Sequence, residues 1–143
     1  MKRVLVTLAL LLSWPAWAES RYDELKRVVD RNTGFAHMTR GVNMFTLIAL
    51  RSCVADGDIP VLAQMLHDRD QVMRLAAAFV LVDMGAQGRA ALEQEVKRPA
   101  DLDERLLLQD ALRDAASPNR EPLKDYVLTE RERSLIKGCA KKP

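Results

Sequence analysis

The chain is predicted to be all-α: a short right-handed α-solenoid of helical hairpins, with about seven or eight helices in its 143 residues. Three observations favour this fold. Apolar residues recur at spacings of three and four along most of the chain, as they do on one face of a helix. Capping residues stand where helices would begin, and Gly or Pro where they would end. The whole pattern also recurs at a fixed interval, and no stretch has the alternation of a strand.

The N-terminal segment, residues 1–18, has the features of a secretory signal peptide. It begins with basic residues and continues with an apolar run too short to span a membrane. Ala16-Trp17-Ala18 then matches a small-residue cleavage site. We expect cleavage after Ala18 and export to the periplasm, with no membrane span left in the mature protein. An uncleaved anchor is the alternative interpretation.

Cleavage would leave residues 19–143 as a single helical domain, since 143 − 18 = 125 residues suffice for one real core. It would remove two of the 22 Lys and Arg residues and none of the 20 Asp and Glu residues. The balance becomes 22 − 2 = 20 against 20, so the formal net charge falls to zero. Basic composition therefore gives no reason to expect a nucleic-acid partner.

The first helices follow from their apolar stripes. Residues 20–33 form a helix that Ser20 caps, and residues 41–54 form one that is apolar on most faces and is expected to be the most buried. A hairpin over residues 59–85 follows. Asp58 and Asp70 are placed to cap its two helices, and Gly85 to end the second.

The second half of the chain repeats the arrangement. Gln87-Gly88 is expected to be a turn before a helix over residues 89–98. Asp101 begins the next helix, and Thr129 with Glu132 forms a capping box for the last one. Four leucines of the helix after Asp101 are expected to point inward: Leu102, Leu106, Leu108 and Leu112.

A repeat of 31 residues (101 − 70 = 31) connects these elements. It aligns three cap residues, a polar column, several apolar columns and a turn column. The aligned sets are Thr39, Asp70 and Asp101; Asn43, Arg74 and Arg105; Met44, Leu75 and Leu106; Ala49–Leu50, Val80–Leu81 and Ala111–Leu112; Gly57, Gly88 and Asn119; Val61, Leu92 and Leu123; and Met65, Val96 and Val127.

The central hairpin resembles one HEAT repeat. The resemblance is carried by Leu62, Leu66, Asp68, Arg74, Ala77, Ala78, Leu81 and Gly85, with Met73 where the family usually has Val. It covers about one repeat and implies a stack of hairpins. In that family an Asp and an Arg tie the turn between the helices together. The resemblance therefore implies structural roles for Asp68 and Arg74.

Two cysteines, Cys53 and Cys139, remain after the signal segment. In an oxidising compartment an even pair favours a disulfide, which would tie the second helix to the C-terminal tail. The alternative is one buried thiol and one exposed thiol. The two Cys and two His residues are not spaced like metal ligands, so no metal site is expected.

Catalytic chemistry has weak support in the sequence, and we expect no enzyme, catalytic residue or cofactor. His67 beside Asp68 suggests a base with its orienting carboxylate, yet neighbours at a helix end do not face each other. A nucleophile at Ser52 or Cys53 would lie within a helix, without the glycines of a nucleophile elbow. Asp56-Gly57-Asp58 resembles part of a calcium loop, but a turn explains it without further ligands.

A repeat surface without a catalytic set is typical of a protein-binding module. Its most concrete form is a periplasmic inhibitor or immunity protein that occludes a toxin or cell-wall hydrolase. The alternatives are an envelope adaptor or assembly scaffold and, less favoured, an enzyme using His67. A weak homodimer is expected only if an end helix is apolar outside. The predicted partner-binding residues are Asp56, Asp58, His67, Arg69, Asp70, Gln87 and Arg89.

Overall fold

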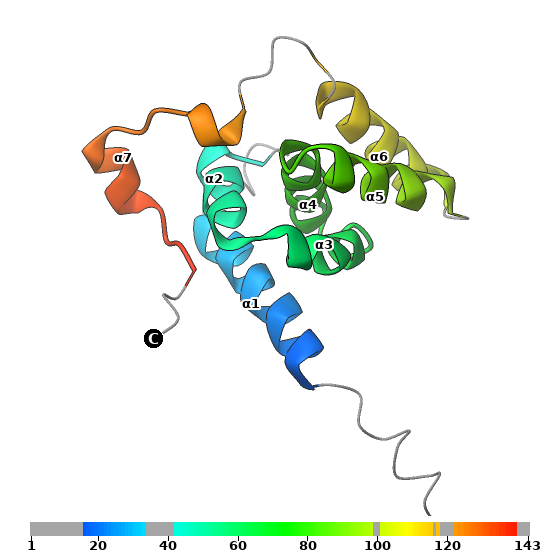
Figure 1. Ribbon diagram of the computed structural model, residues 1–143, viewed down its shortest axis with the longest axis horizontal. Helices are drawn as coiled ribbons and strands as arrows, with labels where there is room; N and C mark the ends of the chain where they lie inside the picture. The colour runs from blue at the N-terminus through cyan, green and yellow to red at the C-terminus, as the bar shows by residue number, and fades with distance from the viewer. Residues whose placement is uncertain (1–15, 34–41, 99–100, 116, 118–121, 140–143) are drawn as a thin grey trace, which may run out of the picture.

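The computed structural model describes residues 16–33, 42–98, 101–115, 117 and 122–139 (Figure 1). Within these ranges the protein is all-helical, with no strand, which confirms the predicted class. The elements are α1 (Ala16–Asn32), α2 (Met44–Cys53), η2 (Asp56–Asp58), α3 (Ile59–Met65), α4 (Gln71–Asp83), α5 (Ala86–Lys97), α6 (Leu102–Ala115), η3 (Leu123–Asp125) and α7 (Glu130–Leu135), where η marks a single 3₁₀ turn.

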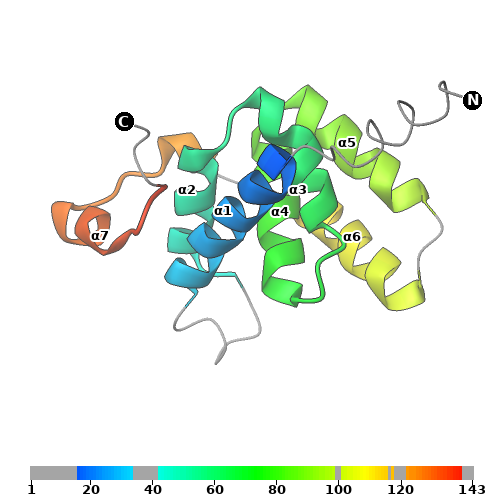
Figure 2. The ribbon, with the colours of Figure 1, turned by 90° about the horizontal axis from the view of Figure 1, so that it is seen from below.

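The first six helices pack in two layers. Helices α1, α3 and α5 contact one another in sequence along one layer, and α2, α4 and α6 do so along the other (Figures 1 and 2). Helix α4 is central, because it also contacts α1, α3 and α5. It buries seven residues where α2 buries four, so the prediction that residues 41–54 form the most buried helix is wrong. The alanines at 76–78 allow the neighbouring helices this close approach.

The interval of 31 residues holds for the inner side of the second layer. Ala49, Val80 and Ala111 occupy equivalent positions on α2, α4 and α6, and all three are buried. The two alanines of this column let the two layers approach closely. Thr39 and Asn119, which were aligned with this pattern, lie outside the described residues.

The helix starts are capped largely as the sequence predicts. The carboxylate of Asp70 accepts the Val72 N–H at 2.8 Å, and that of Asp101 accepts the Glu104 N–H at 2.8 Å. Thr129 and Glu132 form the capping box of α7. Asp58 differs, because its side chain makes no cap bond to α3. Asn43, aligned above with Arg74, caps α2 through the Thr46 N–H at 2.8 Å.

Gly88 lies inside α5, so the turn expected at Gln87-Gly88 is wrong. The chain turns earlier, at Gly85, whose φ of 89° suits a residue without a side chain. Gly88 is needed for packing instead. A Cβ at this position would lie 1.9 Å from the Leu81 carbonyl oxygen of α4. Glycine therefore sets how closely α5 approaches α4.

Of the four leucines of α6 that were expected to point inward, two are on its inner side and two on its exposed side. Leu108 is fully buried and Leu112 half-buried, as expected. Leu102 and Leu106 are exposed instead, at 66% and 47%, so that half of the prediction is wrong. Helix α6 is the last of its layer, and within the described residues no helix covers its outer side.

The two ends of the chain also differ from expectation. Helix α1 begins at Ala16 rather than at Ser20, so it runs through the predicted cleavage site after Ala18. None of the described helices is long and apolar enough to cross a membrane. Helix α7 ends at Leu135, and residues 136–139 continue without helical structure.

Candidate functional site

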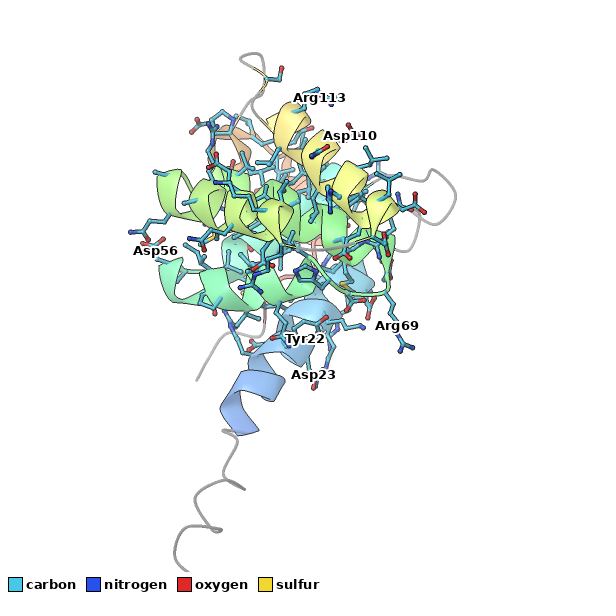
Figure 3. All side chains as sticks on the ribbon, turned by 90° about the vertical axis from the view of Figure 1, so that its right-hand side faces the viewer. Tyr22, Asp23, Asp56, Arg69, Asp110 and Arg113 are labelled. Carbon is cyan, nitrogen blue, oxygen red and sulfur yellow. The ribbon has the colours of Figure 1, made fainter. Side chains whose placement is uncertain are left out.

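The seven predicted partner-binding residues do not form one surface. Asp56, Arg69, Gln87 and Arg89 are exposed, and Figure 3 shows Asp56 and Arg69 on opposite sides of the molecule. The other three, Asp58, His67 and Asp70, make hydrogen bonds within the fold. Three of the seven residues thus help to hold the helices together, and the other four face solvent.

Asp58 is bound by Arg21 of α1. The Arg21 Nε and Nη2 atoms donate to the two Asp58 carboxylate oxygens at 2.8 Å each, and Nη2 also donates to the Cys53 carbonyl at 2.7 Å. The hydrogen bonds to Asp58 outweigh partial burial and raise the pKa of Arg21. This bidentate pair fixes α1 against the turn between α2 and α3.

Asp68 and Arg74 both brace the turn between α3 and α4. The Arg74 Nη1 donates to the carbonyls of Asp68 and Arg69, at 2.8 and 3.2 Å. The buried Asp68 carboxylate accepts the Asp70 N–H at 2.9 Å. These contacts are of the kind that the repeat resemblance implies for this Asp and Arg.

Helix α1 also reaches this turn. The Tyr22 hydroxyl donates to the Asp68 carboxylate, and the Lys26 Nζ lies 3.2 Å from the same oxygen. Partial burial raises the pKa of Asp68, but the hydrogen bonds from Tyr22, Asp70 and Lys26 outweigh it and lower the pKa below 3.8. Burial, followed by the bond to Asp68, raises the pKa of Tyr22.

His67 lies between two carboxylates from different helices. Its Nε2 is 2.6 Å from a carboxylate oxygen of Glu95 on α5, and its Nδ1 contacts the carboxylate of Glu104 on α6. The Glu95 side chain is 8% exposed, that of Glu104 is 23% and that of His67 is 35%. The turn after α3 is therefore tied to both α5 and α6.

The structure does not pair His67 with Asp68, the carboxylate that was considered as its partner in a catalytic site. His67 pairs with Glu95 and Glu104, whereas the Asp68 carboxylate points to Tyr22 and Lys26. The Ser52 hydroxyl donates to the Ala49 carbonyl of its own helix at 2.7 Å. Among the described residues no group of three or more His, Cys, Asp or Glu side chains is arranged to hold a metal ion.

The predicted disulfide is not present in this structure, where Cys53 and Cys139 are both free thiols and are not at bonding distance. The thiols are neighbours all the same. Burial and the hydrogen bond with Cys139 raise the pKa of Cys53 to about 12. Both thiols are half-buried, so the alternative of one buried and one exposed thiol is also wrong.

A small hollow of about 60 Å³ lies between α4, α5 and α6, lined by Val82, Arg89, Glu93 and Leu112. It has room for a few water molecules, whereas pockets for small metabolites are typically several times larger. Arg89, one of the predicted partner-binding residues, forms part of its wall.

A half-exposed apolar row crosses the second helix layer. Met44, Leu75 and Leu106 occupy equivalent positions, 31 residues apart, on the neighbouring helices α2, α4 and α6. Met44 is 40% and Leu106 47% exposed, and Leu75 is partly exposed. Together with Leu102, one turn before Leu106, these residues form what we call the outer helix face.

The outer helix face was present in the sequence as one of the repeat columns. Its apolar character alone does not tell which way it points. The neighbouring column of Ala49, Val80 and Ala111 is five residues further on, about 140° around a helix of 3.6 residues per turn. Since that column is buried, Met44, Leu75 and Leu106 must point away from the core.

The C-terminal segment, residues 122–139, presents a second apolar surface. Leu123 is buried, and its N–H donates to the Asp83 carboxylate at 2.7 Å, next to the Arg51–Asp83 ion pair. Beyond it Val127 is 88% exposed and Leu135 61%, and α7 buries none of its residues. At the end of the segment, the Asn32 side chain binds the Lys137 backbone, accepting its N–H at 3.0 Å and donating to its carbonyl at 2.8 Å.

Comparisons of the chain with models of protein families, with curated proteins and with solved structures find no match.

Proposed function

We propose that the protein is a protein-binding module of HEAT-like hairpins, exported to the periplasm, and that it binds its partner through the outer helix face. The observation that carries the proposal is the exposure of Leu102 and Leu106 on α6, at the open end of a helix layer. In a stack of hairpins the end helix needs a polar outer side unless something covers it.

The surroundings of this face suit a protein partner. Charged residues flank the leucines along α6, and Figure 3 shows two of them, Asp110 and Arg113, on the yellow helix. These two form an exposed ion pair at 3.1 Å. An apolar centre with a charged rim is the usual anatomy of a protein–protein interface. The rim residues are Asp103, Arg105, Gln109, Asp110 and Arg113.

The most concrete form of the proposal is an inhibitor or immunity protein that covers a periplasm-acting toxin or cell-wall hydrolase. Its support is the predicted signal segment and the exposed apolar side chains of the outer helix face. Such a protein needs one surface that fits the target. It would use Leu102 and Leu106 as apolar anchors and the α6 charges for orientation.

An envelope adaptor is the second candidate, and one observation favours it. The exposed residues Val127 and Leu135 lie on or beside α7, whereas Leu102 and Leu106 lie on α6. Figures 1 and 2 both place α7 and α6 at opposite ends of the molecule. Two separated apolar surfaces would allow one chain to connect two proteins.

The test is photo-crosslinking in the cell that encodes the protein. A photoreactive amino acid replaces Leu106 in one variant and Leu75 in a second. The control variant carries it at Gln94, an exposed residue of α5 in the other helix layer. We expect one crosslinked protein from positions 106 and 75 and none from position 94. The same partners from all three positions would overturn the proposed face.

A matched charge substitution completes the test. L106E should abolish co-purification of the crosslinked partner, because it places a charge in the apolar centre, whereas Q94E should not. Both variants should melt within a few degrees of the wild type, since both sites are exposed. Loss of the partner's enzymatic activity on binding would select the inhibitor, and a second crosslinked protein from Leu135 would select the adaptor.

A further inference from the structure

His67 contacts α6 from behind the outer helix face. Glu104 is two residues from Leu102 and from Leu106, about 200° around the helix, and therefore points to the opposite side of α6. Glu95 contacts the other ring nitrogen of His67 from α5. The Glu104 contact lies in the first turn of α6, which is the last helix of its layer and packs against α4 and α5.

With Glu95 and Glu104 ionised, the two contacts of the His67 ring require it to be protonated. An ionised carboxylate only accepts hydrogen bonds, so each ring nitrogen of His67 must carry a proton to donate. Only the imidazolium cation has two N–H groups. Neutral imidazole has one N–H and one lone pair, and the lone pair would face a carboxylate oxygen. One of the two contacts must therefore break when His67 loses its proton.

We propose that His67 is a proton-operated latch that holds the N-terminal turn of α6, and with it Leu102 and Leu106, in the position needed for binding. The inference deepens the proposed function and rests on it, because it describes how the outer helix face is regulated. The latch is closed while His67 is protonated and opens when it is neutral.

Burial decides which contact is lost. Glu95 is the more buried carboxylate, and leaving it without a donor would cost more than releasing Glu104. The Arg98 Nη1 atom also lies 3.4 Å from the second carboxylate oxygen of Glu95 and helps to hold that side chain in place. The remaining N–H therefore stays with Glu95, and Glu104 is released together with its turn of α6.

Among the described residues of the His67 turn, the other charged groups make no hydrogen bond or ion pair with its ring. Asp68 is bound by Tyr22 and Lys26 of α1, and Asp70 caps α4. Arg69 is exposed on the same turn. Glu95 and Glu104 are thus the groups that contact the ring directly and set its charge.

The pKa direction agrees with a latch that is closed at neutral pH. Partial burial lowers the pKa of His67, but the hydrogen bonds to Glu95 and Glu104 outweigh it and raise the pKa above 6.5. A raised pKa in the folded state means that the contribution to stability is complete below the unfolded-state pKa. It is lost as the pH rises through the folded-state value.

The test is hydrogen exchange of the purified protein between pH 6 and pH 9, corrected for the pH dependence of the intrinsic exchange rate. In the wild type, protection of residues 102–108 should fall at least about tenfold across this range, because a charge-assisted hydrogen bond is lost. Protection in the central helix α4 should change much less. Equal protection of α6 at both pH values would overturn the latch.

Two variants separate the latch from ordinary loosening at high pH. E104Q supplies an NH₂ group that can donate to the lone pair of neutral His67, so protection of α6 should be nearly independent of pH. H67Q removes the titrating group, and α6 should be weakly protected at both pH values. If protection of α6 in E104Q falls with pH as much as it does in the wild type, the proposal is contradicted.

The second histidine of the chain provides an internal control. H37Q leaves one histidine, so the remaining imidazole resonance in an NMR titration belongs to His67. Its midpoint should lie above 6.5 and coincide with the loss of α6 protection. A midpoint at or below 6.5, or one separated from the exchange step, would refute the latch.

The latch and the binding face can fail separately, because the exchange experiment needs no partner. Loosening of α6 without a crosslinked partner at Leu106 supports the latch and removes the binding role. A crosslinked partner with no loosening of α6 removes the latch and leaves the binding face standing.

Discussion

Polar side chains add to the buried apolar contacts of Leu25, Val28 and Val29 in positioning α1 on the rest of the fold. Arg21 joins it to the turn before α3, and Tyr22 and Lys26 join it to the turn before α4. None of these contacts is visible in the sequence, since the partners are 37 to 46 residues apart. The sequence indicates that Asp58 is a turn residue, but it does not indicate that Arg21 is its partner.

Replacing Arg21 should show the strength of its contact with Asp58. R21A leaves the Asp58 carboxylate and the Cys53 carbonyl without this donor, and we expect the free energy of unfolding to fall by about 2–3 kcal/mol. Urea unfolding measures the change. R31A removes an exposed arginine of the same helix and should cost less than about 0.5 kcal/mol. Equal losses in the two variants would mean that the pairing contributes little.

Tyr22 gives a pH-dependent prediction. Y22F removes the donor to Asp68 and should cost about 1.5–3 kcal/mol at pH 7, since the acceptor is charged. The pKa of Asp68 is lowered in the folded state, so the stabilisation is present above 3.8 and is lost as the pH falls through the lower folded-state pKa. The cost of Y22F should therefore shrink below pH 4.

Urea unfolding at pH 7 and pH 3 tests the Tyr22 prediction, with Y126F as the matched control. Tyr126 is 37% exposed, and its substitution should change stability by less than about 0.5 kcal/mol at either pH. A cost of Y22F that stays constant between the two pH values would show that Asp68 is not the group that responds.

At the scale of helices, the close approach of α4 and α5 depends on Gly88. G88A places a Cβ 1.9 Å from the Leu81 carbonyl oxygen, which belongs to rigid backbone. The helices must separate, and we expect a loss of at least about 2 kcal/mol in thermal or urea unfolding. G57A is the control, because nothing lies within 4 Å of its added Cβ. If G88A proves as stable as G57A, the packing account of Gly88 is wrong.

Helix positions and caps could be predicted because they depend on neighbours in the sequence. Asp70, Asp101 and Thr129 cap the helices assigned to them. Gly88 misled the prediction, since glycine serves both turns and close helix contacts, and only the neighbouring helix decides between them. Leu102 and Leu106 misled it for a similar reason: an apolar residue is buried only where another element covers it.

At the scale of the whole molecule, the sequence did not predict which side chains of different helices contact one another. The turn residues Asp58 and His67 were predicted to bind a partner, and the structure adds that both also make contacts between helices. His67 illustrates the difficulty, because its partners come from α5 and α6, 28 and 37 residues further on. The repeat of 31 residues places whole helices side by side, but it does not fix which charged side chains meet between them.

The attachment of the C-terminal segment can be tested at Asn32. N32D replaces the amide donor with a carboxylate oxygen facing the carbonyls of Val28 and Lys137. These acceptors repel it, so residues 136–139 should detach, and tryptic cleavage after Lys137 should become about tenfold faster, as for the loss of a buried hydrogen bond. D30N, the reverse exchange at an exposed site on the same helix, is the control and should not alter cleavage.

The bond between Asn32 and Lys137 also has a consequence for the order of folding. It joins residues 105 positions apart, whereas the helix layers are built from elements close in the sequence. Closing a long loop costs more chain entropy than closing a short one, so local hairpins form first. The Asn32 amide therefore finds its last partner only after Lys137 has left the ribosome. Until then, a growing chain can form its helical hairpins, but the Asn32 side chain at the end of α1 lacks its contact with the Lys137 backbone.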